Sequence, residues 1–244
     1  MNKFQKKHIV SSFECDSRLR LRIRSLFNLF QDLADIHANE MGLGYRYCHE
    51  RQLAWIGAGY HVRIHRLPRW EEEITLSTWP SEATSVAGIR DFCVTDKSNH
   101  KLIVASSMWI VLDLNRMRPV SVAKHMPAYE LFPERALESD FSKPTPLTRV
   151  DDTRIFNVHA DEIDLYNHVN NAVYPTWILD AFDEAFLTTH ELSELKITFK
   201  NPAKRQDQIV METQIEGPTT RHVIRSNDGK IFADITALWR YISD

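Results

Sequence analysis

Residues 23–42 decide the fold, and they read Ile-Arg-Ser-Leu-Phe-Asn-Leu-Phe-Gln-Asp-Leu-Ala-Asp-Ile-His-Ala-Asn-Glu-Met-Gly. The apolar side chains recur every three or four residues, which is the spacing of one face of a helix. They are Ile23, Leu26, Phe27, Phe30, Leu33, Ala34 and Ile36. Gly42 is typical of the position just beyond a helix end. We therefore predict a long helix whose apolar face must be buried against another element.

A second helical pattern starts near Ala172, with Pro175 in the first turn, where a helix tolerates proline. Its apolar face comprises Tyr174, Trp177, Ile178, Ala181, Phe182, Ala185 and Phe186. Runs rich in strand-forming residues follow each helical stretch. They cover 55–65, 74–79, 87–95 and 102–114 in the first half, and 195–200, 209–215, 222–225 and 231–242 in the second.

The two halves also match in register. Val62 precedes Ile74 by the same spacing as Ile197 precedes Ile209, with a polar turn between them each time. We interpret this as duplication of one helix-plus-sheet unit. A proline-rich stretch separates the copies. The predicted fold class is α+β, with two tandem hotdog domains, each a long helix wrapped by an antiparallel sheet. The predicted domains are 1–130 and 151–244, joined by a linker over 131–150.

The composition is that of an ordinary globular protein, with 43% hydrophobic and 26% charged residues. The formal charge of −3 includes no long block of one sign, which argues against a nucleic-acid binder. No apolar run is long enough to span a membrane, and the basic start lacks the apolar core of a secretory signal. Three cysteines outside any CxxC spacing predict free thiols in a reducing compartment, so we expect a cytoplasmic protein. They are Cys15, Cys48 and Cys93.

The polar segment 160–175 is the richest candidate for chemistry. It places Asp164 and His168, together with three amide side chains, immediately ahead of the second helical pattern; the amides are Asn167, Asn170 and Asn171. Asn170 or Asn171 is a plausible helix cap, and a lone histidine is often structural. Free N–H groups at a helix start can also stabilise negative charge on a carbonyl oxygen, while a histidine or carboxylate activates water.

The segment Asp-Leu-Tyr-Asn-His-Val-Asn-Asn over 164–171 resembles the acyl-ACP thioesterase family, whose second hotdog domain carries an Asp-x-Asn-x-His-Val-Asn-Asn signature. The first half resembles the same family over 18–44, 68–80, 89–92 and 107–113. The resemblance implies an acyl-ACP thioesterase that releases free fatty acid from acyl carrier protein and needs no cofactor.

By the same resemblance, Asp164 and His168 match the family's catalytic acid and histidine, and Asn170 and Asn171 match the pair that opens the helix. Two positions depart from the family. Tyr166 replaces the signature asparagine, with Asn167 beside it as a substitute, and Pro202 stands where the family has a glutamate. Either His168 oriented by Asp164 activates water, or Asp164 does so itself.

The first half has Arg20 where the second has His168, so it lacks an acid–histidine pair at the matching position. The resemblance implies that this half holds the acyl chain under its helix, along Phe27, Phe30, Leu33 and Ala34, although these positions also suit a plain core. An arginine-rich stretch near the start would dock the acidic carrier, unless it is simply a solvated face. It comprises Arg18, Arg20, Arg22 and Arg24, with Lys3, Lys6 and Lys7 nearby.

Several other functions are disfavoured. His61 and His65 share a strand face but lack a third ligand, so we predict no metal. The glycine pairs do not form a nucleotide loop, and there is no G-x-S-x-G elbow of a serine hydrolase. The remaining alternatives are an acyl-CoA thioesterase and a hotdog protein that binds acyl chains or carrier without turnover. The protein is expected to be a monomer or a homodimer.

Overall fold

The computed structural model describes residues 3–242. The chain divides into two compact units, with the boundary between Asp140 and Phe141. The part up to Asp140 is called unit 1 here, and the part from Phe141 is called unit 2.

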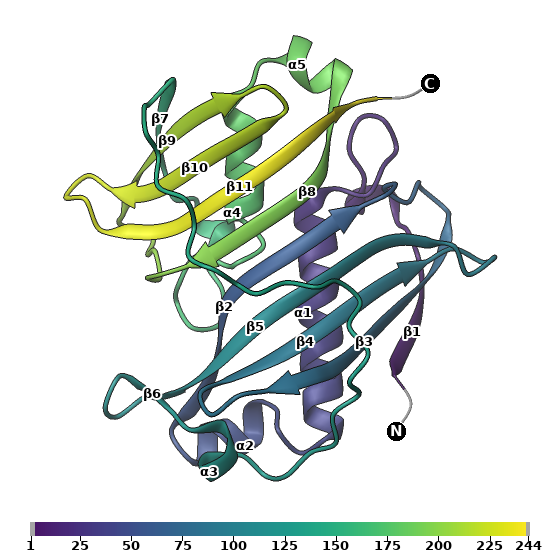
Figure 1. Cartoon of the computed structure of the whole chain (residues 1–244), viewed down its shortest axis with the longest axis vertical. Coiled ribbons are helices and arrows are strands. Elements are labelled where there is room, and N and C mark those ends of the chain that lie inside the picture. Colours follow the sequence, from purple (N-terminus) through teal and green to yellow (C-terminus); the bar gives the residue numbers. More distant parts are fainter. Residues whose placement is uncertain (1–2, 243–244) are drawn as a thin grey trace. The chain divides into compact units, whose positions relative to one another are not determined.

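Unit 1 is an antiparallel sheet with a long helix on one side (Figure 1). The sheet order is β1-β3-β4-β5-β2, and a short β6 pairs with β5. The strands are β1 (Phe4–Ile9), β2 (Leu53–Ile64), β3 (Glu73–Ala83), β4 (Ala87–Thr95), β5 (Lys101–Asp113) and β6 (Arg118–Val120). The helices are η1 (Ser12–Glu14), α1 (Ile23–Glu40), α2 (Tyr45–Glu50) and α3 (Val122–His125).

Helix α1 confirms the first predicted helix. It begins at Ile23 and ends at Glu40, and Gly42 follows with a left-handed φ of 72°. The predicted apolar face is buried against the sheet. The Phe30 ring stacks on Phe92 of β4 at 4.6 Å between ring centroids, so aromatic packing joins the helix to the middle of the sheet.

Unit 2 has the same topology. Its strands are β7 (Asp152–Asn157), β8 (His190–Phe199), β9 (Gln208–Glu216), β10 (Thr219–Ser226) and β11 (Ile231–Tyr241). Their order is β8-β11-β10-β9-β7, all antiparallel. When β7 to β11 are read in place of β1 to β5, the two sheet orders are identical. The predicted duplication is therefore confirmed at the level of topology.

The second long helix was predicted wrongly. The chain instead forms η2 (Ala160–Glu162), then α4 (Tyr174–Trp177), η3 (Ile178–Ala181) and α5 (Glu184–Thr189). The break lies at Asp183, whose backbone is extended and whose Oδ1 accepts a hydrogen bond from the Phe186 N–H at 2.8 Å. An aspartate whose side chain accepts from an N–H three residues later caps a new helix and ends the preceding one. The spacing of the apolar residues does not reveal this cap.

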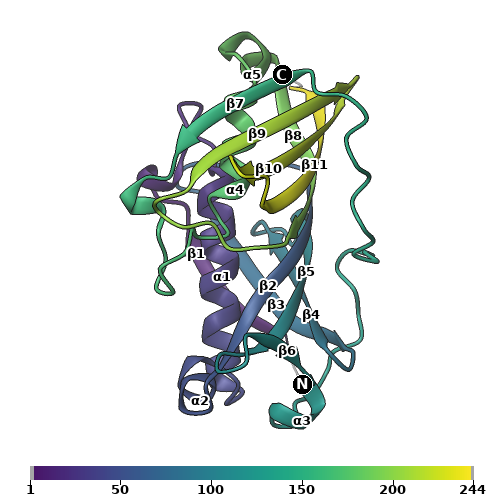
Figure 2. The same cartoon turned by 90° about the vertical axis from the view of Figure 1, so that its left-hand side faces the viewer.

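The segment after α3 has no helix or strand up to β7, yet its first part packs on unit 1. Figure 2 shows this first part, which belongs to unit 1, on the side of the unit 1 sheet opposite α1. The Trp79 indole N–H donates to the Glu134 carbonyl at 2.7 Å, and Leu137 is buried beside Trp79, Cys93 and Val104. Residues that were predicted to form a linker therefore pack on the second face of the unit 1 sheet.

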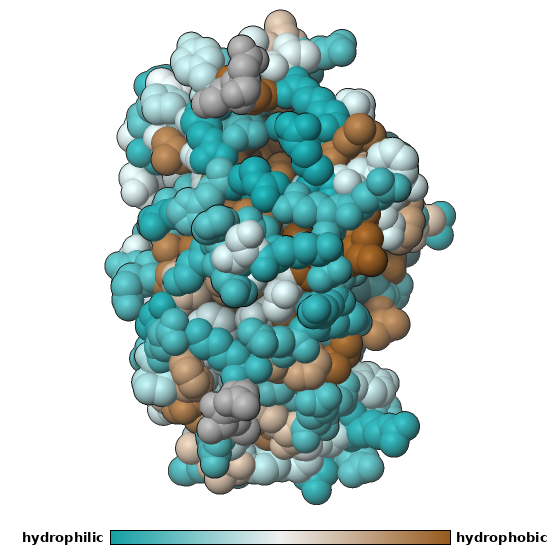
Figure 3. Space-filling model, turned by 90° about the vertical axis from the view of Figure 1, so that its right-hand side faces the viewer, coloured by the Kyte–Doolittle hydropathy of each residue, from teal (hydrophilic) through white to brown (hydrophobic). Residues whose placement is uncertain are grey.

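The three cysteines are buried free thiols, as predicted. Burial raises the pKa of each thiol. No helix in the described part of the chain is long and apolar enough to cross a membrane. On the face drawn in Figure 3, hydrophobic side chains occur in small groups separated by hydrophilic ones. That face therefore lacks one broad apolar patch.

His222 lies buried in unit 2, with Nδ1 and Nε2 each 2.9 Å from a threonine hydroxyl oxygen, those of Thr213 and Thr220. Burial lowers the pKa of His222 to about 3. Between that value and the ordinary histidine pKa, the unfolded chain binds a proton that the folded chain does not. Stability is therefore full above the ordinary value and falls as the pH falls towards 3.

We expect the free energy of unfolding to drop by about 3 kcal/mol through His222 alone when the pH falls from 7 to 4. Urea unfolding at several pH values measures this loss. His222→Gln keeps a donor and an acceptor but cannot titrate, so its pH dependence should be shallower by this amount. Exposed His100 serves as the control through His100→Gln, and an unchanged slope in His222→Gln would contradict the assignment.

Candidate active site

Residues Asp164 to His168 form a tight loop ahead of α4. One carboxylate oxygen of Asp164, Oδ1, accepts hydrogen bonds from the backbone N–H groups of Tyr166 at 2.9 Å and His168 at 3.2 Å. The Asp164 N–H donates to the His168 carbonyl at 2.8 Å. Asn167 has the left-handed φ of 59° that closes the turn. The loop thus fixes the backbone of the two residues predicted to carry the chemistry.

The matching loop of unit 1 has the same geometry. Asp16 Oδ1 accepts from the backbone N–H groups of Arg18 and Arg20, each at 2.9 Å, and Leu19 has a φ of 60°. The second oxygen, Oδ2, binds the Arg20 guanidinium at 3.0 Å from Nη2. The predicted equivalence of Arg20 and His168 therefore holds in three dimensions.

A third copy of the loop joins β4 to β5. Asp96 Oδ1 accepts from the backbone N–H groups of Ser98 at 2.8 Å and His100 at 2.9 Å, and Asn99 has a φ of 63°. Here the fifth residue is also a histidine, and its Nδ1 lies 3.1 Å from Asp96 Oδ2. A histidine at this position therefore reaches the second oxygen of the same carboxylate.

These two loops indicate how Asp164 and His168 are related. In both, Oδ1 holds the backbone and Oδ2 meets the side chain of the fifth residue. Among the described residues, the Asp164 carboxylate bonds only to backbone N–H groups, through Oδ1. The structure thus brings Asp164 and His168 together in one loop without a hydrogen bond between carboxylate and imidazole. Oδ2 is the oxygen left to orient the imidazole or to bind water.

Buried residues support the loop from below. The Val169 N–H donates to the Ala203 carbonyl at 2.8 Å, and the Ala203 N–H donates to the Tyr174 hydroxyl oxygen at 3.2 Å. Burial of Tyr174 raises the pKa of its hydroxyl well above its usual value. Glu162, also buried, accepts from the Trp177 indole N–H at 3.3 Å. The half-buried Asp164 and His168 therefore stand on a packed base.

The residues that depart from the family pattern lie at the surface of unit 2. Tyr166 and Asn167 are exposed in the loop, and Pro202 is exposed next to Ala203. Asn167 serves the turn through its backbone, because asparagine tolerates a left-handed φ better than most residues. Its catalytic role stays a prediction.

The short helix α4 alters the expected source of oxyanion stabilisation. Asn170 Oδ1 accepts from the Ala172 N–H at 2.8 Å, so Asn170 caps the turn that leads into the helix. The N-cap of α4 itself is Val173, and the helix is one turn long. The dipole of a long helix is therefore not available here. The oxyanion role of Asn170 and Asn171 stays a prediction that rests on individual N–H groups.

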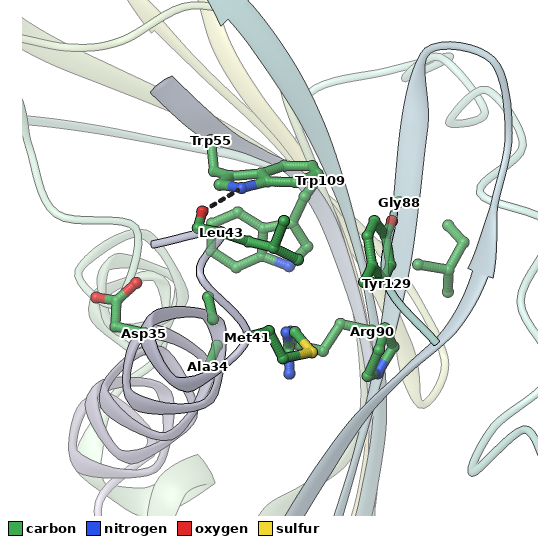
Figure 4. Close-up of a pocket in the computed structure, with 12 residues that line it drawn as sticks. Ala34, Asp35, Met41, Leu43, Trp55, Gly88, Arg90, Trp109 and Tyr129 are labelled. Carbon is green, nitrogen blue, oxygen red and sulfur yellow. Dashed lines mark hydrogen bonds between the residues drawn. The ribbon is translucent and has the colours of Figure 1, made fainter. Parts of the chain in front are cut away.

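Unit 1 contains a pocket, open to solvent, between α1 and its sheet (Figure 4). Ala34, one of the four residues expected to contact the acyl chain, lines this pocket, and its contact with an acyl chain stays a prediction. The other three predicted residues are fully packed against the sheet and the rest of α1. They are Phe27, Phe30 and Leu33, and their contact with an acyl chain stays a prediction.

Aromatic and sulfur-containing side chains supply much of the pocket wall. Trp55 and Trp109 lie across from Met41, and the Trp55 indole N–H donates to the Leu43 carbonyl at 3.1 Å (Figure 4). Tyr129, from the segment after α3, adds a further wall. None of these residues was predicted to line a site, because they come from four separate segments that only the fold brings together.

The cations near the start of the chain are largely paired within unit 1. Arg20 binds Asp16, and Lys6 lies 3.0 Å from Asp32, while Arg22 is exposed. Such pairing lowers the net positive field that an acidic partner would meet. Carrier docking through Arg18, Arg20, Arg22 and Arg24 stays a prediction.

Two protein-family models match the chain. The acyl-ACP thioesterase N-terminal domain matches residues 1–129, and the acyl-ACP thioesterase C-terminal domain matches residues 147–241. Oleoyl-acyl carrier protein thioesterase 2, chloroplastic, of Arabidopsis thaliana is 24% identical over 236 residues, which are 88% of this chain and 64% of that protein. The chain therefore spans less than two thirds of the length of this relative.

Solved structures of low sequence identity share the fold. An acyl-ACP thioesterase from Bacteroides thetaiotaomicron has a TM-score of 0.86 at 18% identity and covers 98% of both chains. The 12:0-ACP thioesterase from Umbellularia californica has the same TM-score, identity and coverage. The predicted arrangement of two tandem hotdog domains is confirmed.

Proposed function

Because the chain belongs to the acyl-ACP thioesterase family, we propose that it hydrolyses the thioester between a fatty acyl group and acyl carrier protein. The products are free fatty acid and the carrier with its pantetheine thiol. Unit 2 carries the chemistry and unit 1 holds the acyl chain. The observation that carries this proposal is the Asp164–His168 loop, which lies within the part of the chain that matches the family's C-terminal domain.

The reaction needs a base, an acid and stabilisation of one oxyanion. A water oxygen attacks the thioester carbonyl carbon, and His168 takes the proton that water loses. The carbonyl oxygen becomes negative and is held by N–H groups at the segment that opens with Asn170 and Asn171. The C–S bond then breaks, and the protonated imidazole returns a proton to the leaving thiolate.

Asp164 has a supporting part in this scheme. Its Oδ1 accepts hydrogen bonds from two backbone N–H groups, which hold the carboxylate in a fixed position. Its Oδ2 orients the His168 imidazole, as the equivalent oxygen of Asp96 does with His100. The alternative, in which Oδ2 itself removes the water proton, uses the same atoms and leaves His168 to bind the substrate.

Thiol release from a panel of acyl-ACPs tests the function. We expect turnover with acyl-ACP, and a kcat/KM at least about tenfold above that for the matching acyl-CoA, because contacts with the carrier add binding energy remote from the reacting bond. Competition between the two substrates measures the ratio directly. A ratio below one would make the protein an acyl-CoA thioesterase, and a tight acyl-ACP complex without thiol release would make it a binding protein.

We also propose that the protein acts in the cytoplasm, in keeping with three buried free thiols. A monomer or a homodimer is expected. Light scattering on the purified protein distinguishes the two.

A further inference from the structure

The unit 1 pocket contains a buried positive charge. Arg90 lies on β4, is about 9% exposed, and lines the pocket. Its Nη1 donates to His37 Nδ1 at 3.0 Å and to the Thr78 hydroxyl oxygen at 3.2 Å. Its Nε and Nη2 make no hydrogen bond to any residue that the structure describes. Figure 4 shows the side chain reaching from β4 towards Met41 and α1, so these N–H groups face the pocket.

No carboxylate among residues 3–242 pairs directly with this guanidinium. Asp35 of α1 also lines the pocket, but its carboxylate points away from Arg90 in Figure 4. Burial lowers the pKa of Arg90 to about 10, against the opposing influence of Tyr129, Tyr60 and Asp35, so the group stays charged at neutral pH. Buried charged groups normally have their hydrogen bonds filled, because an unfilled donor loses its water without replacement.

The remaining wall of the pocket suits an aliphatic chain. It includes Ala34, Met41, Leu43, Trp55 and Trp109. A wholly aliphatic occupant would leave the N–H groups on Nε and Nη2 of the guanidinium without an acceptor. An aliphatic occupant with an oxygen atom opposite Arg90 would both pack against the apolar wall and accept a hydrogen bond from the guanidinium.

We propose that the unit 1 pocket selects acyl chains that carry a neutral oxygen, as a hydroxyl or oxo group, at the position facing Arg90. This inference rests on the proposed function and names its substrate class. A hydroxyl or oxo oxygen accepts the hydrogen bond that Nη2 or Nε offers. A second carboxylate on the chain is disfavoured, because Asp35 already places an acidic group on the same pocket.

The test uses the full chain and acyl-ACPs of one chain length, with a hydroxyl at successive positions, beside the unsubstituted acyl-ACP and the ω-carboxyl chain. We expect kcat/KM for at least one hydroxylated chain to exceed that of the unsubstituted chain by roughly tenfold or more. Arg90→Met should bring this ratio to about one, because the hydroxylated chain loses its hydrogen-bond donor and the unsubstituted chain has none to lose. Arg116→Met, which changes an exposed arginine of unit 1, should keep the wild-type ratio.

The proposal is overturned if no hydroxylated chain is preferred, if Arg90→Met keeps the preference, or if the ω-carboxyl chain is the best substrate. Arg90→Gln, which keeps N–H donors without the charge, replaces Arg90→Met if the latter does not fold, and it should retain part of the preference. If the wild type releases no acyl chain at all, the proposed function fails. Calorimetric binding of free hydroxylated and unsubstituted fatty acids to wild type and variant then still decides the role of Arg90.

Discussion

We expect His168→Ala to lower kcat for acyl-ACP hydrolysis by about 10²–10⁴-fold, which is the usual contribution of a general base. The fold should survive, because His168 enters the loop through its backbone N–H and carbonyl, which alanine retains. Steady-state thiol release measures the loss, and circular dichroism checks the fold. Full activity in this variant would remove His168 from the mechanism.

The loop from Asp96 to His100, the third copy of the Asp loop, supplies a matched control. His100→Ala removes a histidine from the same loop geometry at a surface position, and it should leave hydrolysis unchanged.

Asp164→Asn separates the two roles of the acid. An asparagine keeps one oxygen for the backbone N–H groups but loses the second oxygen as an acceptor. The rate of acyl-ACP hydrolysis should therefore fall, while the free energy of unfolding should change little. Unchanged activity in Asp164→Asn would show that this residue only shapes the loop.

We expect Arg135→Ala to lower the free energy of unfolding by about 3–5 kcal/mol, the usual cost of removing one partner from a buried ion pair. The Arg135 Nε donates to Asp91 Oδ2 at 2.9 Å, and its Nη2 donates to the Ser106 hydroxyl oxygen at 2.9 Å. Asp91 is fully buried, and burial raises the pKa of its carboxyl. Without Arg135 this acid stays buried with no cation beside it. Urea denaturation measures the change.

Two further variants isolate the cause. Asp91→Asn in the Arg135→Ala background removes the unpaired charge and should recover a large part of the lost stability. Arg154→Ala removes an arginine from a surface pair with Asp152 and should change stability little. If Arg135→Ala lowers the free energy of unfolding no more than Arg154→Ala does, then the hydrogen bonds of Arg135 to the sheet do not stabilise the segment after α3.

Much of unit 1 could be predicted because its elements have simple periods. The apolar face of α1 repeats with the helical period and ends at a glycine, and β4 was placed with its observed bounds. The edge strands β1 and β7 were missed, since both are short and largely exposed. An edge strand needs few apolar residues, and its lysines resemble those of a loop.

The candidate site was predicted in part. The acid and the histidine were found from one local motif, and the structure does hold them in one loop. The pocket was not found, because its walls come from distant segments. One feature of the sequence did point to the pocket, namely Arg90 within a run of strand-forming residues. A charged side chain on a buried strand needs a specific partner.

In the three loops that begin at Asp16, Asp96 and Asp164, the path of the backbone does not depend on the side chain of the fifth residue. Because one oxygen of the aspartate and the backbone set the path of the chain, the fifth residue can be arginine or histidine with no change in that path. A duplicated ancestor could therefore have gained or lost its reactive side chain by a single codon change in either copy. Division of labour between the copies would then have required no remodelling of the scaffold.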